Sequence, residues 1–493
     1  MVRERVGGEY WGHHPLLPQA TYTLVAIRDP ERHHHTLTDE SLFRAPADCD
    51  PWHLLSGAGK VVTDGDNPIA LFAALLGLPV TCVSAGMFDK CVPVSDGAAA
   101  RRAAFRAAAV DGLSYRNPFD GQPATLAEII ALCAFWRETI DSNRGLAAAM
   151  GFAGWKRKTV RPLLWPGLAD LPFTRSAADL APGSNVAVWR SRLSPREKGE
   201  LASAGAKLVE VEDGFIRSVG LGADCVPPLS ITVDRLGAHF DPAAPSELEL
   251  LIQHGKIPEE MVDRARRLRE VIVASGISKY GSASTGGWQA RSDKHQILVP
   301  GQVEDDRSVI SGGGAVSTNL ELLKRVRKDR PDAHIIYKPH PDVIAGHRIG
   351  AIPEDQCRAY ADEILSDAPI STVIAAVDEV HVNTSLAGFE ALLRHKPVTT
   401  HGVPFYAGWG LTRDLGAVPE RRSARPSLDA LVAAVLLIYP RYLDPDTGLP
   451  CPPEVLIQRL STPRPKPRPL VALRRLQGRL RNLLAGLKRR APE

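Results

Sequence analysis

The sequence predicts an α/β fold in which parallel sheets carry helices on both faces. Short apolar runs alternate with segments of helical spacing through most of the chain, and this alternation is typical of parallel sheets. Two such sets follow one another, so we expect residues 155–295 and 296–450 to form two Rossmann-like halves that face each other across a cleft. In sheets of this kind, ligands bind at the carboxyl ends of the strands.

The elements of both halves follow from the periodicity of their apolar residues. Residues 186–189 are apolar throughout, as expected of a strand that is buried on both faces. The other predicted strands are 207–211, 296–300, 333–338, 377–382 and 396–399, and the predicted helices are 194–204, 320–326 and 386–393.

An earlier part of the chain resembles the end of the second half. The strand–helix–strand pattern over 59–81, with strands 59–63 and 78–81 and helix 69–76, matches that over 377–399. The polar turn at 115–123 matches that at 442–450 with the same intervals. We interpret residues 1–150 as a partial copy of the C-terminal part of the module. The alternative is a chance resemblance between two units of the same type.

Composition and charge exclude several classes of protein. The 493 residues carry a net charge of only +4, which argues against a chain-wide nucleic-acid binder. The seven cysteines form no C-x-x-C pair, so neither a disulfide framework nor a zinc site is expected. No apolar run reaches the roughly 18 residues that span a bilayer, and the N-terminus lacks the apolar core of a secretory signal. We therefore expect a cytoplasmic protein whose membrane contact is peripheral.

The last segment, 461–493, differs from the rest in its proline, leucine and arginine content. Residues 464–469 predict an extended linker, and leucines then recur at helical spacing among basic residues. A basic amphipathic helix favours an anionic membrane surface, here the inner face of the cytoplasmic membrane. The alternative is a solvated terminal helix that packs on its own protein.

Two adjacent carboxylates, Glu212 and Asp213, directly follow a predicted strand, and Gly214 comes next. Because neighbouring strand residues point to opposite faces, we expect only one of the pair to face the cleft. A carboxylate at the carboxyl end of a strand is well placed as a general acid or base. The simpler interpretation is a helix N-cap with a flanking acid.

A second acidic cluster, Glu304-Asp305-Asp306, comes just after Gln302 and the end of a predicted strand. Burial of three ions is costly, so at least one carboxylate should be exposed, paired or kept for function. An aspartate aimed at the anomeric carbon of a sugar could act as a nucleophile. A divalent-metal site is the alternative, although the neighbouring sequence offers no further ligand set.

Two other strand ends carry groups that suit an anion. Lys338 and His340 lie beside prolines that fix the backbone, and a phosphate or a sugar carboxylate could bind there. Thr384 and Ser385 stand where a strand gives way to a helix, whose N–H groups and dipole favour anions; an ordinary N-cap needs only one of them.

The corresponding strand end of the early copy carries different chemistry. Asp64 and Asp66 stand there, and since carboxylates repel phosphate we expect no nucleotide to bind. Of the weaker features, the aromatic loop 404–412 could close over a ligand or pack between the halves. The glycines at 312–314 predict a mobile loop, and we expect the histidine triplet 33–35 to be inert.

Taken in order, these motifs resemble the KpsC family of capsular polysaccharide β-Kdo transferases, where Kdo is 3-deoxy-D-manno-oct-2-ulosonic acid. The similarity is close over about 180–450 and loose over about 45–135. It rests on the segments 212–218, 228–230, 302–306, 338–341, 384–392 and 404–410.

The resemblance implies a GT-B fold and a retaining transfer of Kdo from CMP-Kdo. We expect no metal or other cofactor, because His340, Lys338 and the helix N-terminus can neutralise the leaving phosphate. The resemblance implies Asp306 as the nucleophile, with Asp305 second, and Glu212 or Asp213 as the acid/base. The implied donor-binding residues are His340, Lys338, Thr384, Ser385, Gln302, Arg217 and Glu390. The implied partners are a lipid-linked acceptor of phosphatidylglycerol type, capsule assembly and export proteins and an anionic membrane, with no nucleic acid.

One departure limits what the resemblance implies. Members of the family carry two full modules, whereas this chain has one full module and a partial copy, so we expect a single linkage type or a partner transferase. Two other functions stay open: a non-catalytic capsule assembly or export protein that binds polysaccharide, and a transferase for another CMP-activated acidic sugar, such as sialic acid.

Overall fold

The structure is a computed structural model that divides into two compact units, residues 1–135 and 136–493, and each unit is described here by itself. The structure describes residues 22–26, 54–55, 58–86, 88–89, 113–167, 169–218, 225–279, 281–282, 288, 292–346 and 348–462. It also describes isolated positions within 99–110. The histidine triplet 33–35 and nearly all of the basic tail lie outside the described residues.

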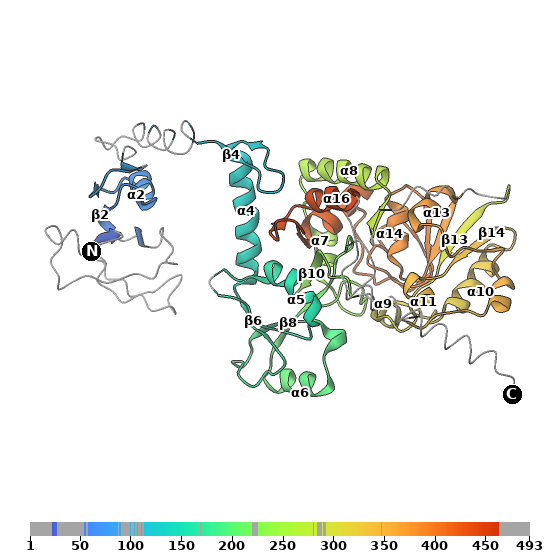
Figure 1. The fold of residues 1–493 in the computed structure, drawn as a ribbon. Helices are drawn as coiled ribbons and strands as arrows, with labels where there is room; N and C mark the ends of the chain where they lie inside the picture. Colours follow the sequence, from blue (N-terminus) through green and yellow to red (C-terminus); the bar gives the residue numbers. More distant parts are fainter. Residues whose placement is uncertain are drawn as a thin grey trace. The chain divides into compact units, whose positions relative to one another are not determined.

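The described part of the first unit holds a three-stranded parallel sheet and a hairpin (Figure 1). The sheet pairs β1 (Tyr22–Ala26), β2 (Ala58–Thr63) and β3 (Val80–Cys82), and α2 (Ile69–Leu76) connects β2 to β3. The short runs 59–63, 69–76 and 78–81 that the sequence predicts therefore do form a strand–helix–strand unit. Gly77, at φ +76°, ends α2 in the left-handed conformation that glycine adopts without strain.

The described part of the second unit contains two large sheets, the first of which has seven strands. In the order β20-β19-β10-β9-β8-β6-β7, β6 to β9 are parallel, and β10, β19 and β20 are antiparallel. Their bounds are β6 Leu146–Met150, β7 Phe173–Thr174, β8 Asn185–Val188, β9 Lys207–Asp213, β10 Ser230–Asp234, β19 Pro440–Leu443 and β20 Pro450–Cys451.

Helices surround this first sheet and are positioned by local sequence signals. Ser194 accepts a hydrogen bond from the Glu197 N–H and the Glu197 carboxylate accepts from Ser194, which is a capping box that starts α6. The helices are α5 Gly154–Val160, α6 Pro195–Ser203, α7 Glu247–His254, α8 Glu259–Ala274 and α16 Pro453–Ser461, and a short hairpin joins β11 (Ile277–Ser278) to β12 (Gly281–Ser282). Another helix, α4 (Leu126–Asn143), enters this unit from the first one.

The second sheet is parallel throughout, as predicted. Its order is β15-β14-β13-β16-β17-β18, with bounds β13 Gln296–Pro300, β14 His334–Lys338, β15 Glu363–Ile364, β16 Glu379–Val382, β17 Val398–Thr400 and β18 Arg413–Asp414. Around these strands in Figure 1 lie α9 Arg307–Gly312, α10 Asn319–Asp329, α11 Pro341–Ile344, α13 Ile370–Ala376 and α14 Leu386–Leu392.

Each sheet has its own apolar core, and β13 and β14 show how the second one is built. Every residue of β13 is buried, and its neighbours Ile335 and Ile336 on β14 are fully buried. Burial on both faces explains why these strands are continuous apolar runs. The register pairs Pro300 with Lys338, so both strands end at the same edge of the sheet.

Two segment boundaries differ from those expected from the sequence. β6 (Leu146–Met150) pairs with β8 in the first large sheet, whereas the predicted partial copy extends to residue 150. β19 (Pro440–Leu443) returns to pair with β10, whereas the predicted second half extends to residue 450. β19 joins a partner that is far away in the chain and β6 joins the next sheet, and local periodicity carries no signal for either pairing.

The expected mobile loop at 312–314 is wrong for two of its three glycines. Gly312 and Gly313 are buried, and a Cβ on Gly312 would lie 3.1 Å from the Cγ2 of Thr384. A Cβ on Gly313 would lie 2.6 Å from the carbonyl oxygen of Val316. These glycines therefore allow the end of α9 to approach the end of β16 closely.

None of the helices among the described residues is both long enough and apolar enough to cross a membrane.

Candidate active site

A cavity of about 700 Å³ lies between the two sheets of the second unit. Its walls are formed by the segments that follow the carboxyl ends of β9, β13, β14 and β16, which is where open α/β sheets bind ligands. The predicted residues that line it are Glu212, Asp213, Gln302, Asp305, Asp306, Lys338, His340, Thr384, Ser385 and Glu390.

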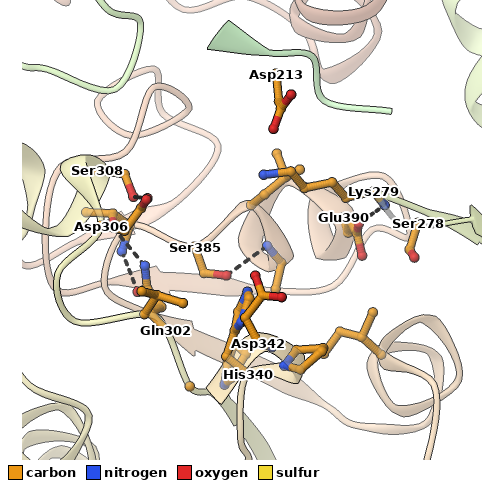
Figure 2. A pocket seen from close by; sticks show the side chains of 18 of the residues that line it. Asp213, Ser278, Lys279, Gln302, Asp306, Ser308, His340, Asp342, Ser385 and Glu390 are labelled. Carbon is orange, nitrogen blue, oxygen red and sulfur yellow. Dashed lines mark hydrogen bonds between the residues drawn. The ribbon is translucent and has the colours of Figure 1, made fainter. Parts of the chain in front are cut away.

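The acidic pair at the end of β9 contributes both of its members to this cavity. Glu212 and Asp213 both line the cavity, so the expectation that only one would face the cleft is wrong. β9 ends at Asp213, and the edge of the sheet forms the wall, which leaves both sides of the strand accessible from it. Figure 2 shows Asp213 approaching the cavity from the side opposite His340 and Ser385.

Asp213 is held between two cations. Its Oδ1 lies 3.2 Å from the Nζ of Lys156, and its Oδ2 lies 2.9 Å from the Nε of Arg217. Burial alone would favour the protonated acid, but Lys156, Arg217 and Lys279 together hold the pKa of Asp213 well below its ordinary value. Asp213 is therefore an anion throughout the neutral pH range. Arg217, expected to bind the donor, is instead fully buried behind Asp213 and is not among the residues that line the cavity.

Glu212 has the opposite character. Burial raises its pKa to about 7, although Arg307 opposes this shift with its Nη1 only 2.7 Å from the Glu212 Oε1. The same Nη1 lies 2.9 Å from the Oε2 of Glu210. A carboxyl group with a pKa near neutrality can accept and release a proton at working pH, as a general acid or base must.

The three consecutive acids after β13 divide into three roles. Glu304 accepts a hydrogen bond of 2.8 Å from the N–H of Asn319 at the start of α10. Asp305 pairs with Arg348 at 2.9 Å and is half exposed. Asp306 stands at the N-cap of α9, and its Oδ2 accepts a hydrogen bond of 2.7 Å from Ser308 (Figure 2). The cluster thus avoids the cost of burying three unpaired ions.

His340 and Lys338 bring positive or hydrogen-bonding groups to the opposite wall. The Nδ1 of His340 accepts a hydrogen bond of 3.1 Å from the N–H of Asp342, and burial, reinforced by Lys279, lowers the pKa of His340 to about 4. The neutral ring therefore carries its proton on Nε2. The Lys338 ammonium donates to the carbonyl of Ser366 at 3.2 Å, and burial lowers its pKa.

Gln302 ties the ends of β13 and β16 together. Its Nε2 donates to the hydroxyl of Thr384 at 2.9 Å, and its Oε1 accepts from the Thr384 N–H at 2.9 Å. Ser385 caps α14, because its hydroxyl accepts from the N–H of Ala387 at 3.2 Å (Figure 2). Both side chains of the predicted anion site are thus oriented by local hydrogen bonds at the cavity wall.

Glu390 is a buried acid on α14. Its Oε1 accepts a hydrogen bond of 2.9 Å from the N–H of Lys279, whereas its Oε2 has no hydrogen-bond partner among the described residues. Burial raises the pKa of Glu390, and the bond from Lys279 opposes that shift.

The aromatic loop 404–412 packs between the two halves. The Phe405 ring lies 4.7 Å from that of Phe215, which follows β9, and 5.5 Å from that of Phe389 on α14. The hydroxyl of Tyr406 donates to the carbonyl of Ser385. Of the two interpretations of this loop, packing between the halves is the one that the structure supports.

The cations of the site that appear in none of the predicted motifs include Lys156, Lys279 and Arg307. Lys156 precedes Asp213 by 57 residues and reaches it only through the tertiary fold. Arg307 directly follows the acidic cluster, and a cation next to three acids was a usable signal. Lys279 lies in a hairpin without periodic pattern, so no local feature indicated it.

The cavity therefore combines an anion that is fixed, an acid that can exchange its proton at neutral pH, and a wall of hydroxyl, imidazole and ammonium groups. Such an arrangement suits the displacement of an anionic leaving group by a hydroxyl nucleophile.

Comparison with known proteins identifies similar chains. The family model described as capsule polysaccharide biosynthesis protein matches residues 185–287 and 282–442, more than half of the chain. The capsule polysaccharide modification protein LipA of Neisseria meningitidis serogroup A is 40% identical over 348 residues, which cover 70% of this chain and 49% of LipA. The lipopolysaccharide-processing protein LpsZ of Rhizobium meliloti is 42% identical over 272 residues, which cover 54% of this chain and 57% of LpsZ. The chain thus spans about half the length of these relatives.

Two solved structures are similar in fold and sequence. Both are structures of KpsC from Thermosulfurimonas dismutans. The β-Kdo 2,7 transferase has a TM-score of 0.53 and 35% identity, and covers 64% of this chain and 97% of its own. The β-Kdo 2,4 transferase has a TM-score of 0.55 and 30% identity, and covers 64% of this chain and 98% of its own.

These matches confirm the resemblance to KpsC-type proteins that the motifs indicate, and also the α/β fold with parallel sheets. The matched region includes the strand ends that line the cavity. The chain belongs to the capsule polysaccharide biosynthesis protein family.

Proposed function

We propose that this chain is a glycosyltransferase of capsule biosynthesis that moves Kdo from CMP-Kdo onto a lipid-linked acceptor. The observation that carries the proposal is the shared cavity, in which acids from the end of β9 face hydroxyl, imidazole and ammonium groups from the second sheet. Similarity to two KpsC β-Kdo transferase structures supports Kdo as the transferred sugar.

The donor phosphate would bind to the second sheet. Lys338 supplies charge, and the neutral His340 donates from Nε2 because its Nδ1 is already an acceptor. Thr384 and Ser385 supply hydroxyl and backbone donors near the start of α14. Together these groups would stabilise the charge that develops on departing CMP, so that the step needs no metal ion.

The transfer would proceed with retention through two displacements. Asp306, in place at the N-cap of α9, attacks C2 of Kdo while the bond from C2 to the phosphate oxygen breaks and CMP leaves. An acceptor hydroxyl then attacks C2, its proton passes to Glu212, and the bond to Asp306 breaks. Of the two β9 acids, Glu212 is the better proton acceptor, because its pKa is raised to about 7 whereas Asp213 is held ionised.

We also propose that the two halves form a GT-B arrangement and that residues 1–150 are largely a partial copy of the module. The acceptor would be of phosphatidylglycerol type, at the inner face of the cytoplasmic membrane. Capsule assembly and export proteins would be its partners, and a second transferase would supply any alternating linkage.

The test is donor and product analysis with purified protein, CMP-Kdo and a lipid-linked Kdo acceptor. We expect CMP release and a Kdo–acceptor product whose anomeric configuration matches that of the donor. Asp306→Asn and His340→Ala should each lower CMP release by about 100-fold or more. The matched control is Asp305→Asn, because that side chain is half exposed and already paired with Arg348.

Other outcomes separate the competing functions. Tight binding of Kdo glycans without CMP release would indicate an assembly or export protein. A preference for CMP-sialic acid would indicate a transferase for another acidic sugar. If Glu212 is the proton acceptor, the rate of the acceptor step should rise with pH through about 7, as Glu212 loses its proton. Glu212→Gln should abolish this rise and lower the rate by about 100-fold to 10,000-fold.

A further inference from the structure

Lys156 is a buried lysine whose ammonium group has two distinct contacts. It lies on α5, and its side chain is 6% exposed. Its Nζ lies 3.1 Å from the centroid of the Trp189 ring and 3.2 Å from the Oδ1 of Asp213. Lysines are almost never buried to this degree unless they are paired, and here the pairing is with a residue that lines the cavity.

Arg217 approaches the same carboxylate from another direction. Its Nε lies 2.9 Å from the Oδ2 of Asp213, so each oxygen of Asp213 faces its own cation. Arg217 is anchored independently, since its guanidinium donates to the Ser218 hydroxyl at 2.8 Å and to the Val226 carbonyl at 2.6 Å. Two cations from separate elements therefore fix both the charge and the orientation of Asp213.

The remaining charges around Asp213 are of both signs. Lys279, which follows β11, also favours the ionised form of Asp213. The carboxylate of Asp213 in turn repels that of the neighbouring Glu212. Burial lowers the pKa of Lys156 to about 8, although the attraction of Asp213 opposes that shift. The ammonium and the carboxylate thus stabilise each other's charged forms.

We propose that Lys156 is a positioning residue that keeps Asp213 ionised and fixed in orientation, and that it thereby leaves proton exchange to Glu212. The inference rests on the proposed function of the cavity and deepens it. Lys156 lies outside the matched family region, 185–442, and outside every motif of the sequence. Through this one residue on a separate helix, the two adjacent acids of β9 take different roles.

The direct test is a carbon-detected NMR titration of the Asp213 carboxyl group in the full chain without substrate. In Lys156→Met, the methionine retains an unbranched apolar stem on Trp189 but lacks the charge. We expect the pKa of Asp213 to rise by about one pH unit or more, because a cation within 4–6 Å typically has an effect of this size. Lys158→Met, an exposed position on the same helix, should leave the titration unchanged. An unchanged pKa of Asp213 in Lys156→Met would overturn the proposal.

A reciprocal measurement covers the case in which Lys156→Met does not fold. In Asp213→Asn, the ammonium loses its anion, so the pKa of Lys156 should fall below its value in the unmodified chain. No change in that pKa would equally overturn the proposal.

Activity measurements then separate this proposal from the proposed function. The acid limb of the pH–rate profile should move to higher pH in Lys156→Met and return in Lys156→Arg, which restores the cation. If Lys156 had only a structural role, Lys156→Met would lose rate at every pH without moving the acid limb. That result would count against a positioning role. If the unmodified chain releases no CMP from CMP-Kdo, the proposed function fails, while the NMR titrations still decide whether Lys156 controls Asp213.

Discussion

Two strand–helix–strand motifs share their local geometry: β2–α2–β3 of the first sheet in the chain, called the early unit below, and β16–α14–β17 of the large parallel sheet, called the late unit. In each, the two strands are parallel, and the residue after the second strand donates its N–H to the last residue of the first. That bond joins Val83 to Thr63 at 2.9 Å in the early unit and His401 to Val382 at 2.8 Å in the late one.

The helix starts are also alike. The side chain of Asn67 accepts a hydrogen bond from the N–H two residues later at 3.1 Å, and Ser385 does the same at 3.2 Å. Both are short polar side chains that satisfy an N–H group in the first turn of a helix.

The hairpins that follow have the same register. Tyr115 pairs with Ala124 in β4–β5, and Tyr442 pairs with Cys451 in β19–β20, so each pair is nine residues apart. Within the turns, Gly121 has φ +71° and Gly448 has φ +74°. This similarity supports the proposal of a partial copy.

The two units differ at the polar positions after the first strand. The late unit places Thr384 there, tied to Gln302 at the wall of the cavity. The early unit places Asp64 and Asp66 there. Apolar spacing and turn residues thus maintain the scaffold in both units, whereas the side chains at the strand end differ in charge.

The largest expected effect comes from replacing Thr384 of the late unit with an aspartate, the residue type that the early unit carries after its first strand. Thr384→Asp removes the hydroxyl that accepts from Gln302 and places a carboxylate where the donor phosphate is proposed to bind. We expect kcat/KM for CMP-Kdo to fall by about 1,000-fold or more, measured by CMP release. Thr384→Ser keeps the hydroxyl and should retain activity within about tenfold. Comparable losses in both variants would mean that charge is not the reason for the difference between the two units.

A smaller effect is expected when the support of Thr384 is removed. Gln302→Leu leaves the buried N–H of Thr384 without its acceptor, which typically costs about 1–3 kcal/mol. Urea unfolding should report this loss of stability, and CMP release should fall by about tenfold to 100-fold. Gln302→Glu keeps an acceptor for the N–H of Thr384 but loses the donor to its hydroxyl. Its stability should therefore lie between that of the unmodified chain and that of Gln302→Leu.

The matching turns can be tested against each other. Gly121→Ala and Gly448→Ala each place a Cβ on a backbone with positive φ where the surrounding space is open. Each should therefore lose about 1–2 kcal/mol from backbone strain alone, measured by urea unfolding. Clearly unequal losses would contradict the structural match between the hairpins.

The smallest effect is expected in the early unit. Asp66→Asn should change neither CMP release by more than about twofold nor the melting temperature appreciably, since the exposed side chain keeps its size and surface substitutions usually change stability by no more than about 0.5 kcal/mol. A large loss of transfer would show that the early unit takes part in the chemistry.

Local periodicity predicted the elements that lie inside one half. The strand Gln296–Pro300 and the helix Ile69–Leu76 have the predicted bounds, because each is a continuous apolar segment between clear boundaries. The antiparallel strands β10 and β19 were not predicted as members of the first sheet. Their pairing depends on contacts between residues about 200 positions apart, which no local pattern encodes.

The candidate site was predictable to the extent that its residues lie at strand ends. Glu212, Asp306 and His340 could be predicted because each lies at or after the carboxyl end of an apolar strand, and the carboxyl ends of parallel strands share one edge. Lys156 could not, since its task depends on Trp189 and Asp213, which it meets only in the folded chain. The different protonation of Glu212 and Asp213 likewise follows from the cations around them rather than from the sequence order.

The amide of Gln302 has a consequence for the direction in which Thr384 can act. Because its Nε2 already donates to the Thr384 oxygen, the hydroxyl hydrogen must point away from Gln302. The threonine is therefore polarised as a donor before any ligand arrives. A ligand atom that presents lone pairs at this wall can therefore accept the Thr384 hydrogen, whereas one of the two lone pairs of the hydroxyl oxygen is already engaged by Gln302.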